Sequence, residues 1–489
     1  MQYRTETDSM GDVSGPAGAY VVPSTLRAVD DFPISNRRFS RRFIWALGLI
    51  KGSVATVAAE RGAKDSEASD ATRRAADEVM DGALDDQFVL DIFQTGSGTS
   101  TNTNANEVIA ARASELLDGE RGTHRVHPND DVNYAQSSND VIPTAIHLAT
   151  VAAIREELLP ALDTLAGDLA AKASEFADVV KSGRTHLMDA TPVTLGQEFG
   201  GFASQIRHGQ ARLERVLPEL EELALGGTAT GTGINAPDGF AARVIELMAE
   251  RTGMAFREAD DHFEAQGAKD AAVAAAGVLN TIAVSYVKIA NDIRFLGSGP
   301  TSGISELKIP SLQPGSSIMP GKVNPVMSEM MMQVAAKVVG NASTVSWSGA
   351  LGNFELNGMM PVLAHSLLES VDLLANAATT FAERCVRGCE ANAERARELV
   401  ERNAIVVTAL NPYIGYDNGS RIAKTAVATG KSVRELVLAD GLMKEDELDA
   451  ALELSFDLSA IRTWVFGTGQ LWSTRPLPPR SGGRPVDSR

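Results

Sequence analysis

The segment 313–325, QPGSSIMPGKVNP, gathers hydroxyls, glycines and a lysine immediately before a long stretch of helical patterning. Backbone N–H groups around glycines can form a concave anion site, and Lys322 would add a positive charge. Asn324 followed by Pro325 predicts a helix start, where the helix dipole also favours an anion. We therefore expect an anion-binding loop, and the glycine-rich stretch 297–315 is typical of a loop that closes over a substrate. A plain linker between two helices is the alternative interpretation.

This segment is not the phosphate loop of nucleotide-binding proteins. That loop needs Gly, four residues and then Gly-Lys-Ser/Thr, directly after a strand. Here five residues separate Gly315 from Gly321, and Val323 stands where the magnesium-binding hydroxyl is required. No strand is predicted before it, so nucleotide binding is excluded.

Three further segments offer hydroxyls and amides next to predicted helices. They are 95–107 (TGSGTSTNTNANE), 127–140 (HPNDDVNYAQSSND) and 181–192 (KSGRTHLMDATP). Each alone is compatible with ordinary helix capping. Together with 313–325 they supply neutral donors that suit a small dicarboxylate. No metal site is predicted, because His124 and His127 with the following acidic residues fit no standard zinc spacing.

Helices must position these segments, since the chain is rich in Ala, Leu and Glu and only 5% aromatic. We expect short strands within 1–40 and helices at 41–61, 66–81, 105–117, 139–174, 192–222, 239–252, 269–296, 325–350, 361–388 and 392–403. Thr191 followed by Pro192 predicts one of these helix starts. The long helices predict an extended bundle with more apolar surface than one chain can cover, hence an oligomer. The fold class is mainly α, with predicted domains 1–138, 139–391 and 392–463 and a disordered tail, 464–489.

The composition limits the partners. The net charge of −18, from 45 basic and 63 acidic residues, argues against nucleic acid or an anionic membrane. Two cysteines, Cys385 and Cys389, exclude a disulfide framework, fit a reducing cytoplasm and are expected to be buried apolar residues. The most apolar stretch, 271–287, is shorter than the ~20 residues of a membrane span. We expect a cytoplasmic protein.

At these four segments the chain resembles the fumarase/aspartase superfamily, and within it the class II fumarases. GSSIMPGKVNP (315–325) resembles the superfamily signature, and the similarity covers about residues 1–460. It implies a three-domain, mainly α fold whose long central helices form a multi-helix core in a homotetramer, with active sites shared between three subunits. Aspartases usually have Gln, Thr and Ala where this chain has His186, Ser138 and Gly321. All three positions therefore favour a fumarase.

The resemblance implies reversible, stereospecific hydration of fumarate to (S)-malate through an aci-carboxylate carbanion, with no metal or organic cofactor. An aspartate ammonia-lyase and an inactive structural relative are the alternatives. One segment departs from the family: residues 22–28 are VPSTLRA, where GAQTQRA is common. Both family glutamines are missing, which leaves the docking of this segment open.

The same resemblance assigns the site residues. Either Ser316 or His186 would take the carbon-bound proton, and the sequence leaves both open. Glu329 would orient His186, and we expect it off the exposed face because methionines 327 and 330–332 surround it. Lys322 and Asn324 would stabilise the carbanion. The substrate-binding residues would be Ser97, Gly98, Thr99, Ser137, Ser138, Asn139, Thr185, Ser317, Lys322, Val323 and Asn324. His127, Pro128, Asn129 and Asp130 would form a second dicarboxylate site.

Overall fold

The computed structural model describes residues 3–8, 10–16, 18–20 and 23–456, and these are mainly helical, as predicted. These residues fall into two compact units: the described residues up to 177 with 196–392 form the first, and 178–195 with 393–456 form the second. The predicted domain boundaries stay predictions. The predicted disorder of 464–489 and the domain end at 463 lie outside the described residues.

The first unit begins with an antiparallel pair of strands, β1 (Tyr3–Asp8) and β2 (Gly11–Pro16), in the region where short strands were expected. Helix α1 (Pro23–Asp31) then docks on helix α4 (Thr99–Asp118). The buried Glu107 carboxylate accepts hydrogen bonds from Ser24 N, Thr25 N and the Thr25 hydroxyl. The described part of the unusual segment, residues 23–28, therefore docks through Ser24 and Thr25, without the two family glutamines.

Helix α2 (Arg41–Glu60) is the core helix of this end of the unit and packs against α3 (Ser66–Met80) and α5 (Ser138–Ala153). Helix α4 begins six residues before the predicted start at 105. The reason is local: Gly98 takes a left-handed conformation (φ 72°), and the Gln94 side chain accepts from Thr101 N in place of a conventional cap. A short 3₁₀ turn, η1 (Asp85–Gln87), lies between α3 and α4.

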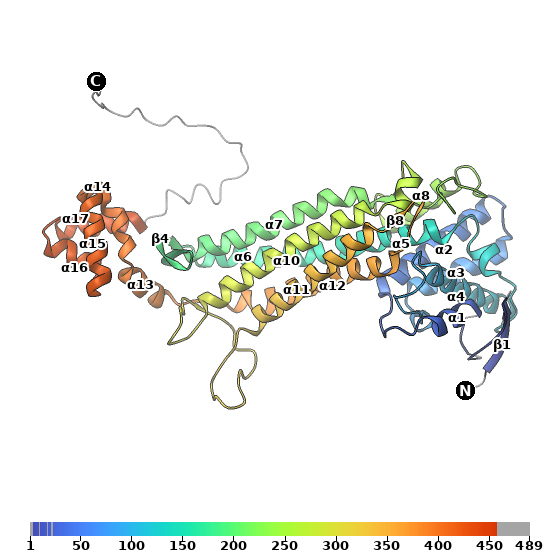
Figure 1. Cartoon of the computed structure of the whole chain (residues 1–489), viewed down its shortest axis with the longest axis horizontal. Coiled ribbons are helices and arrows are strands. Elements are labelled where there is room, and N and C mark those ends of the chain that lie inside the picture. Colours follow the sequence, from blue (N-terminus) through green and yellow to red (C-terminus); the bar gives the residue numbers. More distant parts are fainter. Residues whose placement is uncertain (1–2, 9, 17, 21–22, 457–489) are drawn as a thin grey trace, which may run out of the picture. The chain divides into compact units, whose positions relative to one another are not determined.

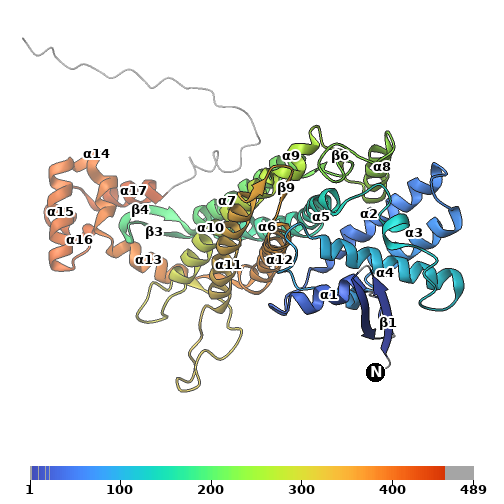
Figure 2. The same cartoon turned by 45° about the vertical axis from the view of Figure 1, so that its right-hand side comes forward.

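Long helices run side by side through the rest of the first unit (Figures 1 and 2). The predicted helix 139–174 is interrupted by a π-helical turn, η3 (Ile154–Leu158), just before Pro160, which cannot donate a backbone hydrogen bond. Helix α10 packs on α11, and α11 packs on α12. The bundle helices are α5, α6 (Leu159–Glu175), α7 (Leu195–Leu220), α10 (Asp270–Leu296), α11 (Val326–Gly349) and α12 (Met360–Arg384).

Short elements connect these helices. Helices α8 (Phe240–Thr252) and α9 (His262–Gly267) lie between α7 and α10. Three pairs of two-residue strands join neighbouring loops: β5 (Glu222–Leu223) with β6 (Arg257–Glu258), β7 (Leu307–Lys308) with β10 (Glu390–Ala391), and β8 (Gly352–Asn353) with β9 (Leu356–Asn357). A 3₁₀ turn, η4 (Val386–Gly388), follows α12, and the two cysteines beside it are buried and free, as predicted.

Two helices, α2 and α10, have the length and hydropathy of a membrane span among the described residues. Helix α2 is buried in the core on most sides. Helix α10 buries one face against α11 and α12 and leaves the other uncovered. Helices of this length and hydropathy also occur in the cores of soluble assemblies, so these two properties do not distinguish a membrane span from a core helix.

The second unit contradicts one predicted helix start. Pro192 does not begin a helix: it lies in strand β4 (Met188–Thr194), paired with β3 (Val180–Thr185), and α7 starts at Leu195. A two-stranded hairpin has free edges, so a residue without an N–H is tolerated there. The pattern of Thr191 and Pro192 alone could not reveal a strand partner ten residues earlier.

The remaining helices of the second unit surround a small apolar core that includes Val407, Leu410, Ile422, Val437 and Leu448. A capping box begins α16, since the Ser432 hydroxyl accepts from Glu435 N and the Glu435 carboxylate accepts from Ser432 N. The elements are α13 (Ala393–Arg402), the 3₁₀ segment η5 (Ala404–Leu410), α14 (Asn411–Ile414), α15 (Tyr416–Thr429), α16 (Val433–Ala439) and α17 (Glu445–Phe456).

Candidate active site

Two of the four polar segments meet at the starts of α4 and α5. The Ser97 hydroxyl lies 2.6 Å from the Thr99 hydroxyl, which lies 2.7 Å from the hydroxyl of Ser138. Gly98 is required between them, because a Cβ there would lie 2.9 Å from the Ile142 side chain and the backbone is left-handed. Two helix N-termini thus present adjoining hydroxyls, an arrangement that favours an anion.

The second of these segments, Ser137–Asn139, is fixed on both sides. Ser137 caps α5 by accepting from Asn139 N, and the Asp140 carboxylate accepts from Ser137 N in a capping box. The Asn139 side chain donates to the carbonyl of Ala229 at 2.8 Å. The segment therefore presents its polar side chains from a rigid helix start.

Sequence reasoning missed the loop that receives this hydrogen bond. Residues 226–235, GGTATGTGIN, combine glycines with hydroxyl residues, as three of the four predicted polar segments do. This composition could have identified the loop as a fifth candidate segment. The backbone N–H groups of Gly226 and Thr228 donate to Asp140, so the loop and the helix start form one structure.

The segment 313–325 forms a closed loop around Ser316. Gly315 N donates to the Lys322 carbonyl at 2.8 Å, and the Asn324 side chain donates to the Gly315 carbonyl at 2.9 Å. The Ser316 hydroxyl oxygen accepts from Ile318 N at 3.2 Å and from Met319 N at 3.0 Å. These N–H groups therefore point at a serine oxygen, and Lys322 is exposed beside them.

A single chain does not bring the Ser316 loop to the Ser97 cluster. Met360 N donates to the Gly96 carbonyl, and the Asn357 side chain donates to the Ser348 carbonyl, so the Ser97 cluster lies at the C-terminal end of α11. The Ser316 loop precedes the N-terminus of the same helix and projects from the bundle (Figure 1). Helix α11 has 24 residues, hence a length of about 36 Å.

His186 and Thr185 belong to the second unit, at the tip of the β3–β4 hairpin. His186 and Leu187 form the two-residue turn between the paired residues Thr185 and Met188, with φ angles of 58° and 60°. Left-handed backbone at two non-glycine residues is strained, and such strain is often found at functional sites. The tip is exposed, and Leu187 is 72% exposed.

One expectation about Glu329 is wrong. It lies in the first turn of α11 and is exposed in this chain, whereas Met331, two residues later, is buried. The reason is the helical period: among the four methionines around Glu329, only Met331 is fully buried. Glu329 and His186 lie in different units, so their pairing stays a prediction.

The segment predicted as a second dicarboxylate site forms a π-helical turn, η2 (Pro128–Val132). The His127 ring accepts from Asp130 N, and the backbone N–H of His127 donates to the Asp131 carboxylate. Asp131 also pairs with Lys64 at 3.3 Å. The segment thus carries one exposed carboxylate, that of Asp130, and a second that is paired with Lys64. These negative groups do not favour a dianion, and this site stays a prediction.

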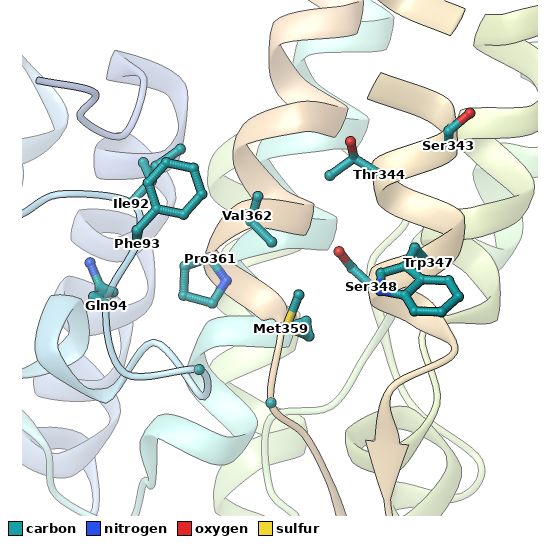
Figure 3. Close-up of a pocket in the computed structure, with 12 residues that line it drawn as sticks. Ile92, Phe93, Gln94, Ser343, Thr344, Trp347, Ser348, Met359, Pro361 and Val362 are labelled. Atoms are coloured by element: carbon teal, nitrogen blue, oxygen red, sulfur yellow. The ribbon is translucent and has the colours of Figure 1, made fainter. Parts of the chain in front are cut away.

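A shallow, mainly apolar pocket of about 510 Å³ lies beside the Ser97 cluster (Figure 3). Phe93 and Gln94 line one side, and Trp347 and Met359 line the other. Trp347 is 69% exposed, an unusual degree for tryptophan. A lining of this kind does not suit a dicarboxylate, and it leaves an apolar surface uncovered next to the site.

Two family models match the chain: a lyase model over residues 11–340 and a model of the fumarase C C-terminus over residues 406–455. The solved class II fumarase of Schistosoma mansoni matches with a TM-score of 0.90 and 36% identity, covering 93% of this chain and 99% of that chain. The fold and the polar segments therefore define a lyase of the fumarase/aspartase type.

Curated relatives narrow this class. The class II fumarate hydratase of Mycobacterium tuberculosis is 51% identical over 457 residues, which are 92% of this chain and 95% of the relative. That of Halobacterium salinarum is 53% identical over 451 residues, which are 92% and 96% of the two chains. The chain belongs to the class II fumarate hydratase family.

Proposed function

We propose that this chain catalyses the reversible, stereospecific hydration of fumarate to (S)-malate. The environment of Ser316 is the observation that carries this proposal. Its hydroxyl oxygen already accepts two backbone N–H groups, from Ile318 and Met319. These donors would stabilise an alkoxide, because hydrogen bonds to a charged oxygen are roughly twice as strong as those to a neutral one. The closed loop therefore suits a serine that acts as a base.

In the dehydration direction, the Ser316 alkoxide would take the proton from the carbon beside one carboxylate of malate and become the neutral hydroxyl. The electron pair moves into that carboxylate and produces an aci-carboxylate with two negative charges. A positioned base contributes about 10²–10⁴ in rate. Lys322, exposed in the same loop, would attract the substrate dianion and offset the charge on the serine oxygen.

Stabilising the aci-carboxylate is the larger part of catalysis, since the C–H group of malate is a far weaker acid than any ionisable side chain. Preorganised donors that face the developing charge are worth about 10²–10³ in rate each. Lys322 and Asn324 would serve one carboxylate. The hydroxyls of Ser97, Thr99 and Ser138 and the amide of Asn139 would bind the other.

In the last step the electron pair held in the aci-carboxylate forms the double bond of fumarate, and the carbon–oxygen bond breaks with its own pair leaving on the hydroxide. His186 would give its proton to the departing hydroxide, so that water leaves. In the hydration direction the same imidazole would take that proton from water, with Glu329 orienting the ring. Neither step calls for a metal or an organic cofactor, because fixed donors and Lys322 carry the charge.

The proposed site needs more than one copy of the chain. The Ser97 cluster and the Ser316 loop are separated by the length of α11, about 36 Å, far more than a four-carbon acid can span. The uncovered faces of α10 and α11 carry exposed apolar side chains, since Val284 is 57% exposed and Val339 is 42% exposed. We therefore propose a homotetramer in which three subunits contribute the Ser97, Ser316 and His186 segments to each site. We also propose that it is cytoplasmic, without a nucleic-acid or membrane partner.

A substrate comparison tests the reaction. Purified protein given malate should produce fumarate, measured as rising ultraviolet absorbance, without added metal. The same protein given aspartate should release no ammonia, because His186, Ser138 and Gly321 stand where fumarases differ from aspartases. Faster turnover of aspartate would establish the ammonia-lyase alternative, and no turnover of either acid would favour an inactive relative.

A further inference from the structure

We infer that Asp140, supported by Lys51, is a positioning residue that holds the Ser137–Asn139 segment in register with the Gly226–Ala229 loop. Neither residue would touch the substrate. The inference rests on the proposed function only in taking Ser137–Asn139 as part of the dicarboxylate site.

Asp140 joins two parts of the chain through one buried carboxylate. One oxygen accepts from Ser137 N at 2.9 Å. The other accepts from Gly226 N at 3.1 Å and from Thr228 N at 3.0 Å. The Asp140 residue is fully buried. Because the neighbouring Asn139 donates to Ala229, both the backbone and the side chain of the site segment are tied to this loop.

Lys51 holds the same segment from the other side. It lies on α2, is fully buried, and donates to the side-chain oxygens of Asn133 at 2.8 Å and Gln136 at 3.0 Å. Asn102 of α4 also donates to the Asn133 oxygen at 3.2 Å. The four residues before Ser137 are therefore fixed to α2 and to the helix that carries Thr99.

The two buried charges are costly for folding, which argues that they do more than stabilise. Burial lowers the pKa of Lys51 to about 7 and raises the pKa of Asp140, and each opposes the other's shift by its charge. Well-packed apolar residues often stabilise a fold as well as buried charged groups do. What the two charges provide here is a fixed position for Ser138, whose hydroxyl must lie beside that of Thr99.

The test compares Asp140→Asn and Lys51→Met with a matched control, Asp65→Asn. Asp65 also caps a helix, accepting from Ala68 N, but it precedes α3, outside the site. An asparagine at 140 keeps one acceptor oxygen, so its NH₂ group must face either Ser137 N–H or the N–H groups of Gly226 and Thr228. The misplaced segment should lower kcat/KM for malate by about 10²-fold, mostly through KM. The kcat and KM of Asp65→Asn should equal those of the parent protein.

A folded Asp140→Asn variant with the kcat and KM of the control would overturn the inference. If this variant does not fold, Lys51→Met carries the same test, since it preserves size and removes only the charge and the donors. The effects of the two changes should also be non-additive in the double variant, because both act on one segment. Additive effects would show that the residues act separately.

Amide hydrogen exchange separates this inference from the proposed function. Exchange at Ser137, Gly226 and Thr228 should be faster in Asp140→Asn, and exchange at Ser137 faster in Lys51→Met, with no such change in Asp65→Asn. Unchanged exchange at all three amides would overturn the positioning role. Absence of turnover in the parent protein would instead defeat the proposed function, and the exchange result would still decide the role of Asp140.

Discussion

The hydroxyl of Thr99 lies 2.7 Å from the hydroxyl of Ser138, although 39 positions separate the two residues. Thr99 is the first residue of α4 and Ser138 the first of α5. Two helix starts thus converge with their hydroxyls side by side. In the proposed site, this contact would provide the donors for one carboxylate from residues that look like ordinary helix starts in the sequence.

Replacing either hydroxyl should weaken catalysis without unfolding the protein. We expect Thr99→Val and Ser138→Ala each to lower kcat/KM for malate by about 10²-fold, because each removes one donor from the developing charge. The double variant should be little worse than either single variant, since the two hydroxyls act together. Thr164→Val, which removes an exposed hydroxyl bonded within α6, is the control. Full activity of both single variants would contradict the site.

Ser316→Ala should lower kcat by about 10²–10⁴-fold, because it removes the proposed base and leaves the two N–H donors without their acceptor. Thermal unfolding should change little, since the loop is largely exposed. Ser311→Ala, on an exposed residue of the same connecting segment, should behave as the parent. Near-normal turnover of Ser316→Ala would shift the base role to His186.

Two impaired variants, Ser138→Ala and Ser316→Ala, should regain activity when they are mixed. Ser138 lies near the C-terminal end of α11 and Ser316 precedes its N-terminus, so a shared site can receive an intact Ser138 from one copy and an intact Ser316 from another. After joint denaturation and refolding, the mixture should regain part of the parent's turnover. Each variant refolded alone is the control. A mixture that stays as inactive as its components would contradict sites shared between subunits.

Gly315→Ala should open the Ser316 loop. A Cβ at this position would lie 2.6 Å from the Lys322 carbonyl oxygen, which accepts the loop-closing hydrogen bond from Gly315 N. We expect kcat/KM to fall by about 10²-fold, as a displacement near 1 Å in a catalytic group can cause. Gly167→Ala, in α6 with open space around it, should retain full activity. Equal activity of the two variants would mean that loop closure is unimportant.

Acid stability should depend on Glu115. Burial acts in the opposite direction, but hydrogen bonds from Tyr20, Arg112 and Arg121 lower the pKa of Glu115 to about 2. A lowered pKa stabilises the folded state above the unfolded value of about 4.3, and this contribution is lost as the pH falls toward 2. Because the hydrogen-bonded group around Glu115 is partly exposed, we expect its charge to contribute on the order of 1 kcal/mol to the free energy of unfolding at pH 7.

Thermal unfolding from pH 7 to pH 2 checks this expectation. The midpoint of Glu115→Gln should be lower than that of the parent at pH 7, and the difference should shrink below about pH 4.5. Glu175→Gln, at an exposed residue paired with Lys172, should show little effect at any pH. A difference that persists at pH 2 would rule out the charge of Glu115 as its cause.

Local patterns in the sequence determined the helices and many of their ends. Ser137 caps α5, and Ser432 with Glu435 forms a capping box, because these hydrogen bonds join residues within four positions of each other. The apolar period of the long helices was equally readable, because it repeats every few residues. The polar segments were also recognisable, because each is a short run of consecutive residues whose hydroxyl, amide and charged groups can be read directly from the sequence.

The tertiary structure alone decided how these segments combine. Pro192 lies in a strand because of its partner Ser182, and Asp140 binds an otherwise unnoticed loop 86 residues later. The fold also places the Ser97 cluster and the Ser316 loop at opposite ends of α11, so that one chain cannot complete the proposed site. Contacts between distant residues depend on the path of the whole chain, and no short stretch of sequence contains that path.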